Sequence, residues 1–363
     1  MKTPKPQGHL MDIRFDRLFY VMCCFGGGLA LLYFGSIFLI PIAMALLISL
    51  ILYPVCLWIE SFRIGRVLAT VIVLVLVLAL VSGIFIVSSK EIASIVRGLS
   101  DFEIKLKDIS NAVISFLNDR VSILPRIDQN DVVDQGHEMV KKSGGSIVTN
   151  TLSQTGHIIS GFVMTLVYTF LLLIYRSGLK KTAKQFAGDS DRDAIENMIM
   201  EIQKVGKNYL LGMSIMILIL GTTNAIVLLV FGLDNAIFFG FLAAFLAIIP
   251  YVGTLTGAMI PVIYAFMTTD SLWTPLGIAL SFWLIQFIES NFLTPRIVGG
   301  NLNLNALAAI VALILGGYLW GVAGMVLFLP LTAMFRVFCS YYQPLLPVSN
   351  LLGDELKSRD LNS

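Results

Sequence analysis

The chain has 363 residues, of which 57% are hydrophobic and only 13% are charged. A soluble domain carries about 25% charged residues, so this chain has too little polar surface to cover a water-soluble globule. The formal net charge of +2 is too small to indicate binding to nucleic acid. With a mean hydropathy of +0.85, the chain is predicted to be an all-α polytopic membrane protein whose immediate partner is the lipid bilayer.

The apolar residues gather in about eight hydrophobic segments. About 20 consecutive apolar residues are needed to cross a bilayer as a helix. Six segments meet this need as single spans, and they cover residues 18–34, 37–58, 67–87, 158–175, 209–231 and 272–288.

The other two segments, residues 236–267 and 304–341, are apolar but interrupted. The interrupting residues are Pro250, Gly253, Gly257 and Pro261 in the first, and Gly316, Gly317, Gly321, Gly324 and Pro330 in the second. Each half of the first segment has about 14 residues, which is too short for a comfortable crossing. The glycines alone could serve helix packing, but packing does not need the prolines. We therefore predict two broken, re-entrant helical hairpins.

The two broken segments also resemble each other. Tyr251 and Tyr318 each precede a glycine by six residues, and each glycine is followed by an apolar run and a proline. Each segment follows an uninterrupted span, and the basic loops indicate that these two spans cross the membrane in opposite directions. Residues 209–267 and 272–338 are therefore predicted to form an inverted repeat, an architecture common in transporters. The alternative is a chance coincidence of glycines and prolines.

The basic residues predict the orientation, because short loops rich in Lys and Arg remain in the cytoplasm. Residues 1–17 carry four basic side chains, the loop after residue 60 carries Arg63 and Arg66, and residues 176–207 carry seven. Placing these loops inside puts both termini in the cytoplasm. It also puts the large polar region, residues 88–155, outside. The cytoplasmic placement of the C-terminal tail requires in addition that each broken segment returns to the side from which it entered.

Five regions follow from this plan. Residues 1–87 hold a tail and three spans, 88–155 an extracytoplasmic helical region, 156–207 the fourth span and a cytoplasmic helical loop, 208–341 the core with both broken hairpins, and 342–363 a cytoplasmic tail. Within the outer region, apolar residues at helical spacing predict an amphipathic helix over 92–117. The Asp131, Asp134, His137 and Glu138 group is interpreted as a solvated acidic face instead of a metal site.

Catalytic motifs are missing from the sequence. It has no G-x-S-x-G, no H-E-x-x-H and no phosphate-binding loop pattern. Its four cysteines lie in or beside apolar runs without metal-type spacing. We therefore expect no enzymatic activity, no cofactor and no metal. Without a nucleotide site, such a protein would move a solute passively or by coupling to an ion gradient.

A polar stretch, residues 287–304, stands between the last uninterrupted span and the second broken segment. Gln286 and Glu289 are three residues apart and share a helix face. Glu289 is the one acidic residue between residues 236 and 341 apart from Asp270. It is therefore a candidate for a coupling carboxylate that carries a proton or cation. The alternative is an interfacial glutamate paired with Arg296.

Other polar residues complete the candidate site. Asn291 and Arg296 are candidate contacts for a substrate or ion, although Arg296 is equally well explained as a topology anchor. Pro295 and Gly299 are candidate helix-breaking positions. Thr222, Thr223 and Asn224 lie within a predicted span and face the same cavity in this hypothesis, although hydrogen bonding between helices would explain them as well.

The residues from Gln286 onward resemble the signature of the autoinducer-2 exporter family of permeases. The residues that match are Gln286, Glu289, Asn291, Pro295, Gly299, Leu302 and Leu304, together with Gly321, Gly324, Pro330 and Leu331 and with the stretch from Ile249 to Gly253. The resemblance implies an oligomeric permease of the bacterial inner membrane, connected with export of a signalling molecule or with sodium/proton antiport. Ala306 departs from it, because many relatives have proline there.

Three functions are compatible with these observations. The first is a secondary transporter for a small molecule or ion, with its site between the two broken segments and Glu289 as the coupling residue. The second is a channel along the axis of an oligomer. The third is a membrane scaffold that presents residues 88–155 to partners outside the cell.

Overall fold

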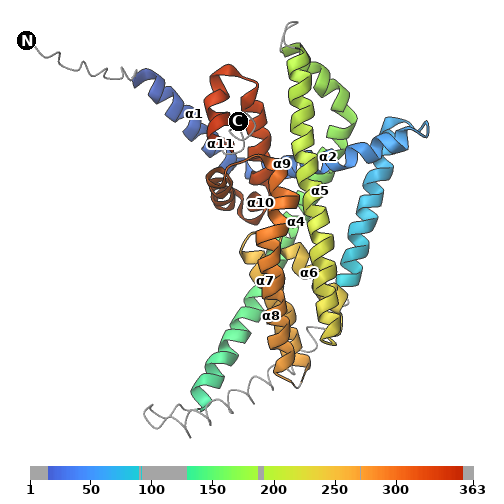
Figure 1. The fold of residues 1–363 in the computed structure, drawn as a ribbon, viewed down its shortest axis with the longest axis vertical. Helices are drawn as coiled ribbons and strands as arrows, with labels where there is room; N and C mark the ends of the chain where they lie inside the picture. The colour runs from blue at the N-terminus through green and yellow to red at the C-terminus, as the bar shows by residue number, and fades with distance from the viewer. Residues whose placement is uncertain (1–14, 90, 92–128, 187–191, 270, 355–363) are drawn as a thin grey trace, which may run out of the picture.

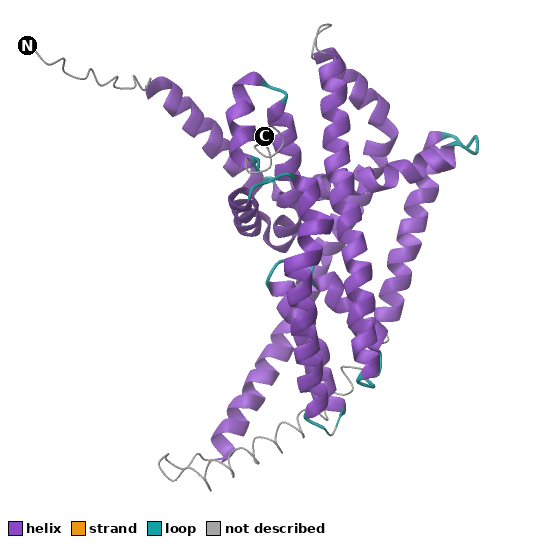
Figure 2. Cartoon of the chain, viewed as in Figure 1, coloured by secondary structure: helices purple, strands orange, loops and turns teal. Residues whose placement is uncertain are grey.

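The computed structural model describes residues 15–89, 91, 129–186, 192–269 and 271–354. Most of these residues are helical, short turns join the helices, and none of the described residues forms a strand (Figures 1 and 2). The longer helices are α1 (Phe15–Phe34), α2 (Ser36–Glu60), Arg66–Ser89, α4 (Gln129–Phe186), α5 (Arg192–Val230), α6 (Ala236–Leu246), α7 (Val252–Thr268), α8 (Trp273–Ile288) and α10 (Ala306–Ser340). The predicted all-α membrane class is confirmed.

Six of the described helices are long and apolar enough to cross a membrane. They are Ser36–Glu60, Arg66–Ser89, Ile158–Gln185, Arg192–Val230, Trp273–Gly299 and Ala306–Ser340. The first five contain predicted single spans, and the sixth is the second broken segment. The predicted helix before the span at 209–231 is also present, because α5 begins at Arg192 and continues without interruption into the membrane.

The outer region can be compared with the prediction only in part. The helix predicted over 92–117 lies outside the described residues, as do the side chains of Asp131, Asp134, His137 and Glu138. Residues 129–155 are helical and form the first part of α4. The helix therefore runs through the predicted boundary at residue 156 without a break.

The second, third and fourth spans pack into one unit at the basic loop. The Nη2 atom of Arg176 in α4 donates to both carboxylate oxygens of Glu60 in α2, at 2.7 and 2.5 Å, and the guanidinium lies 5.0 Å above the Tyr53 ring. Arg66 donates to the backbone oxygen of Ile174 at 3.3 Å. These contacts hold the ends of the three helices at one level, above a shared apolar cluster that includes Cys56.

The first broken segment is a pair of helices, α6 and α7, joined by a turn that ends at Tyr251. Tyr251 has φ 64° and ψ −60°, a conformation that is strained for a residue with a side chain. The residue before it is Pro250, which cannot continue the α6 hydrogen-bond ladder. The predicted break is therefore found at Pro250. Figure 1 shows the pair beside α8, with the turn near the middle of the molecule.

The other three interrupting residues of this segment lie within α7 and do not break it. A Cβ atom on Gly253 would lie 1.7 Å from the backbone oxygen of Leu246, and one on Gly257 would lie 2.9 Å from that of Ala243. Both glycines therefore allow α6 and α7 to approach closely. Pro261 is buried inside the helix.

The second broken segment bends back on itself at Gly321. This residue has φ 60° and ψ −139°, which is not helical. A Cβ atom on Gly324 would lie 1.9 Å from the backbone oxygen of Gly316, so the two arms of α10 are in direct contact. Gly317 and Pro330 remain within helical arms. Of the five interrupting residues, Gly321 forms the turn, and Gly316 and Gly324 allow the two arms to pack directly against each other.

The base of this hairpin is tied to the C-terminal helix α11 (Leu346–Leu352). Asn305 accepts a hydrogen bond from the Ala308 backbone at 2.8 Å and caps α10, which starts at Ala306. The Asn305 amide also donates to the backbone oxygens of Leu351 and Gly353, at 2.7 and 3.0 Å. The start of the hairpin is therefore bonded to the end of the C-terminal helix α11.

Helix α5 is the common neighbour of the two hairpins. An apolar cluster joins it to α6, to the end of the α8 span and to the second arm of α10. The members of this cluster are Tyr209, Met216, Leu220, Ala244, Val298, Leu302 and Ala333. Each hairpin follows a long helix, as the repeat hypothesis requires, and the symmetry between the two halves stays a prediction.

Candidate functional site

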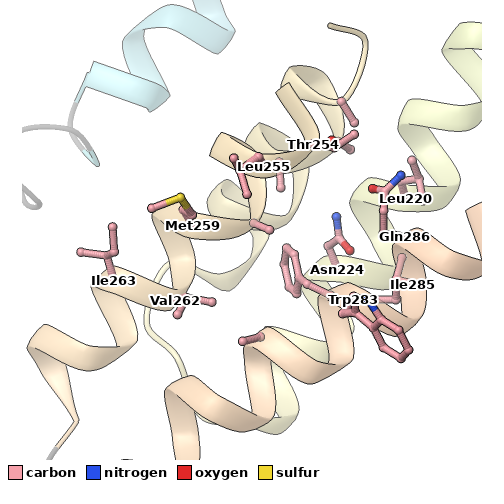
Figure 3. Close-up of a pocket in the computed structure, with 16 residues that line it drawn as sticks. Leu220, Asn224, Thr254, Leu255, Met259, Val262, Ile263, Trp283, Ile285 and Gln286 are labelled. Carbon is pink, nitrogen blue, oxygen red and sulfur yellow. The ribbon is translucent and has the colours of Figure 1, made fainter. Parts of the chain in front are cut away.

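A cavity of about 410 Å³ lies between α5, α6, α7 and α8. Figure 3 shows side chains of these helices around it. The residues that line it are Leu220, Asn224, Ala243, Ala244, Ala247, Thr254, Leu255, Ala258, Met259, Val262, Ile263, Ala279, Phe282, Trp283, Ile285 and Gln286. Five of them are alanines, so short side chains on three facing helices leave the space open.

The polar part of the lining consists of Asn224, Thr254 and Gln286, and none of the sixteen lining residues is charged. Asn224 is only 5% exposed, and its Oδ1 atom has no hydrogen-bond partner among the described residues. Thr254 donates its hydroxyl to the backbone oxygen of Tyr251 at 2.9 Å. Buried polar groups are normally paired, so the Asn224 oxygen is an acceptor that the described side chains and backbone leave unused.

The three polar residues predicted on α5 have different surroundings. Asn224 lines the cavity, as the hypothesis requires. Thr222 and Thr223 are exposed, and the Thr223 hydroxyl donates to the backbone oxygen of Ile219 at 2.8 Å within its own helix. The expectation that all three face the cavity is therefore met by Asn224 alone.

Gln286 connects the cavity to Glu289. Its Nε2 atom donates to Oε2 of Glu289 at 2.5 Å and contacts the Ser290 hydroxyl at 3.1 Å. Ser290 donates to the same carboxylate oxygen at 3.1 Å, and Thr294 donates to Oε1. Three uncharged groups thus hold the carboxylate.

The alternative interpretation of Glu289, a pair with Arg296, is not found among the described residues. Within the described part of the chain, no ion pair links these two residues, and Arg296 is exposed. Asn291 is also exposed, and its amide donates to the backbone oxygen of Phe287 at 2.8 Å. Neither Asn291 nor Arg296 lines the cavity, so their predicted roles as substrate contacts have no support from its lining.

The polar stretch after α8 leads to the second broken segment and begins as a continuation of the helix. It winds as a π-helix over Glu289–Leu293 and again over Pro295–Gly299. The Thr294 backbone N–H bonds to the oxygen of Glu289, five residues earlier. The wider winding accommodates Pro295, which has no N–H for the usual bond. Single π turns inside helices are frequent at functional sites.

Close packing against α5 holds this π-helical segment in place. A Cβ atom on Gly212 of α5 would lie 2.9 Å from the backbone oxygen of Ile297. Val298 is buried against the same helix. Gly299 has only ordinary contact distances around it, the nearest atom lying 3.7 Å away. The predicted hinge at Pro295 and Gly299 is thus a packed helical turn.

The cavity is formed without the second hairpin. Among the described residues, none of α10 lines it. The site was predicted between the two broken segments, but the cavity borders only the first of them. The second hairpin belongs, through Ala333, to the apolar cluster on α5. Thr254, Trp283 and the five alanines were not predicted from the sequence, where the adjacent pair Ala243 and Ala244 in α6 was the only signal.

Comparison with known proteins points to a transporter family. A sequence model described as "AI-2E family transporter" matches residues 22–343. The chain is 27% identical over 312 residues to the AI-2 transport protein TqsA of Escherichia coli K12, which covers 84% of this chain and 86% of TqsA. It is 24% identical over 315 residues to YrrI of Bacillus subtilis 168, with the same coverage.

Proposed function

Since this chain belongs to the AI-2E family of membrane transporters, we propose that it is a secondary transporter that exports a small solute or exchanges Na⁺ for H⁺, with Glu289 as the coupling carboxylate. The site is the cavity between α5, the first hairpin and α8. Because it is bounded by a broken helix, a small movement of α6 against α7 would change access to it.

One observation carries the proposal, namely that Gln286 belongs to both the cavity and the carboxylate site. Its side chain lines the cavity and donates to Glu289 at 2.5 Å. A solute that draws this amide toward itself removes a donor from Glu289. Since a carboxylate that loses a donor holds its negative charge less favourably, solute binding and cation or proton binding become linked.

The groups around Glu289 suit this exchange. Its described partners are one amide and two hydroxyls, which leave the negative charge without a permanent counter-ion. A proton or a sodium ion would supply that counter-charge, and carboxylate and hydroxyl oxygens are suitable ligands for a hard cation. A fixed salt bridge with Arg296 would have made the site unresponsive.

The transporter is proposed to lie in the bacterial inner membrane with both termini in the cytoplasm, as a homo-oligomer. The topology rests on the basic loops, such as the one that carries Arg63 and Arg66. The five-region organisation predicted from the sequence is retained with it, including residues 88–155 on the outer side.

Purified protein in liposomes tests the proposal with the ions alone. An imposed sodium gradient should drive proton movement, followed with a pH-sensitive dye inside the vesicles. Glu289→Gln should abolish this movement. Glu201→Gln is the matched control, because Glu201 contacts Tyr341 at 3.0 Å and does not line the cavity. If Glu289→Gln keeps its full sodium and pH dependence, the coupling role is wrong.

A further inference from the structure

A second cavity continues the first along α7 and α8. It has a volume of about 320 Å³ and shares Val262, Ile263 and Ala279 with the first. Its remaining lining residues are Phe266, Leu272, Pro275 and Leu276, all of them apolar. The two cavities therefore form one groove with a polar end at Asn224 and Gln286 and an entirely apolar end at Leu272.

The rim of this groove is apolar as well. Leu255, Leu276 and Trp283 are 63, 60 and 66% exposed, and all three line the groove. In a bilayer, exposed side chains of this kind on a membrane span face hydrocarbon and not water. The groove is thus accessible from the lipid phase, between the returning arm of the first hairpin and α8.

The polar end has the chemistry of an uncharged hydrogen-bonding site. Asn224 has a buried oxygen without a partner among the described residues, and the Gln286 nitrogen is already bound to Glu289 and Ser290. A ligand hydroxyl can both donate and accept, so it can satisfy amides in either orientation. A charged head group would lose its hydration without meeting an opposite charge, since no lining residue is charged.

We propose that this groove binds an uncharged amphipath, with a hydroxyl-bearing head at Asn224 and a hydrocarbon chain along α7 and α8, and that the ligand enters sideways from the bilayer. The inference rests on the proposed function in one respect: if the protein is a transporter, this amphipath is the class of solute that it carries. Binding itself requires no ion gradient and can be measured separately.

Photolabelling in nanodiscs tests the binding. The probe is 1-decanol with a diazirine in its chain, the headless control is decane with the same diazirine, and labelled peptides are identified by mass spectrometry. We expect the decanol probe to label α7 and α8 preferentially. Asn224→Leu should reduce this labelling about tenfold, the effect of losing roughly 1.4 kcal/mol of hydrogen bonding.

A pair of neighbouring substitutions provides the matched control. Ala279→Trp places a large side chain inside the groove and should also prevent labelling. Leu280→Trp adds a similar ring on the same helix at a position that is 66% exposed and does not line the groove, so it should leave labelling unchanged. Unlabelled decanol should compete with the probe, whereas ionised decanoic acid and glycerol should compete at least about tenfold less well.

Equal labelling by decanol and decane, or labelling unchanged by both Asn224→Leu and Ala279→Trp, would overturn the inference. Effective competition by glycerol would overturn it as well. If a variant fails to fold, the competition of unlabelled decanol, decanoic acid and glycerol with the probe on the wild-type protein decides whether the groove binds the amphipath. If the amphipath does not bind in the groove but the protein still exchanges ions through Glu289, only the inference about the groove is wrong. If the groove is labelled as expected but Glu289→Gln exchanges ions normally, only the proposed coupling role of Glu289 is wrong.

Discussion

The Nε2 atom of Gln286 lies 2.5 Å from Oε2 of Glu289, and the two side chains share one face of the α8 span. Gln286 is half-buried at the edge of the cavity, and Glu289 is half-buried one helical turn further along. This contact joins the lining of the cavity to the carboxylate, so we expect a substitution at either residue to change the behaviour of the other.

Gln286→Leu should therefore weaken ion-driven exchange while Glu289 is still present. A hydrogen bond to a charged group contributes roughly 1.5–3 kcal/mol, and about 1.4 kcal/mol corresponds to a factor of ten. We expect sodium-driven proton movement in liposomes to fall by at least about tenfold. Gln203→Leu, at an exposed position of α5, serves as the control. Equal activities for the two variants would show that the contact has no role in coupling.

Gly253→Ala should destabilise the first hairpin. The added methyl group would lie 1.7 Å from the backbone oxygen of Leu246, and backbone cannot move aside as a flexible side chain would. Overpacking of this kind costs about 1–3 kcal/mol or more, so the unfolding temperature in detergent should fall. Gly161→Ala is the comparison, because nothing lies within 4 Å of that position in α4. A similar unfolding temperature for both variants would contradict the close packing of α6 and α7.

The breaks in the two hairpins were predictable from residue type. Pro250 has no N–H to continue a helix, and Gly321 adopts a positive φ that favours glycine. Pro261 and Pro330 have the same residue type and yet lie inside helices. A proline in a membrane helix frees a backbone oxygen that neighbouring groups can satisfy, and those neighbours are a property of the tertiary structure. Counting prolines and glycines therefore located both segments but not the exact turns.

The candidate site was predictable only at its polar side chains. Glu289 and Gln286 stood out because polar side chains are rare in a membrane span. The continuation of α8 as a π-helix depends on Gly212, which leaves room for the Ile297 backbone on a helix about 85 residues earlier in the chain. No local pattern contains that contact. The cavity likewise exists because alanines of three separate helices face one another.

Asn305→Ala should loosen the base of the second hairpin. This side chain caps α10 through Ala308 and binds the backbone oxygens of Leu351 and Gly353. Losing an N-cap costs about 0.5–2 kcal/mol, and each further hydrogen bond contributes about 0.5–1.5 kcal/mol. Proteolysis of the C-terminal helix in detergent should therefore become faster. Asn350→Ala provides the control, because the Asn350 side chain is exposed; equal cleavage rates would refute the clamp.

The ion pairs between α4 and α5 predict a dependence of stability on acid. Glu196 lies outside the apolar part of α5, and its carboxylate is bound by Lys180 at 2.5 Å and by Lys184. These two lysines lower the pKa of Glu196 from 4.5 to about 2. A lowered pKa in the folded state means that the stabilisation is complete above pH 4.5 and disappears as the pH falls from there through about 2.

Wild-type protein in detergent should accordingly lose thermal stability between pH 5 and pH 3 more steeply than Glu196→Gln, which has no proton to gain at that position. The range is chosen to begin just above the unfolded pKa of 4.5 and to remain above the folded value of about 2. Glu201→Gln should keep the steep wild-type dependence, because Glu201 is paired with the Tyr341 hydroxyl and not with a lysine among the described contacts. Parallel curves for wild type and Glu196→Gln would mean that the lysines contribute nothing to joining the two helices. The comparison is most informative at low ionic strength, since salt screens exposed ion pairs.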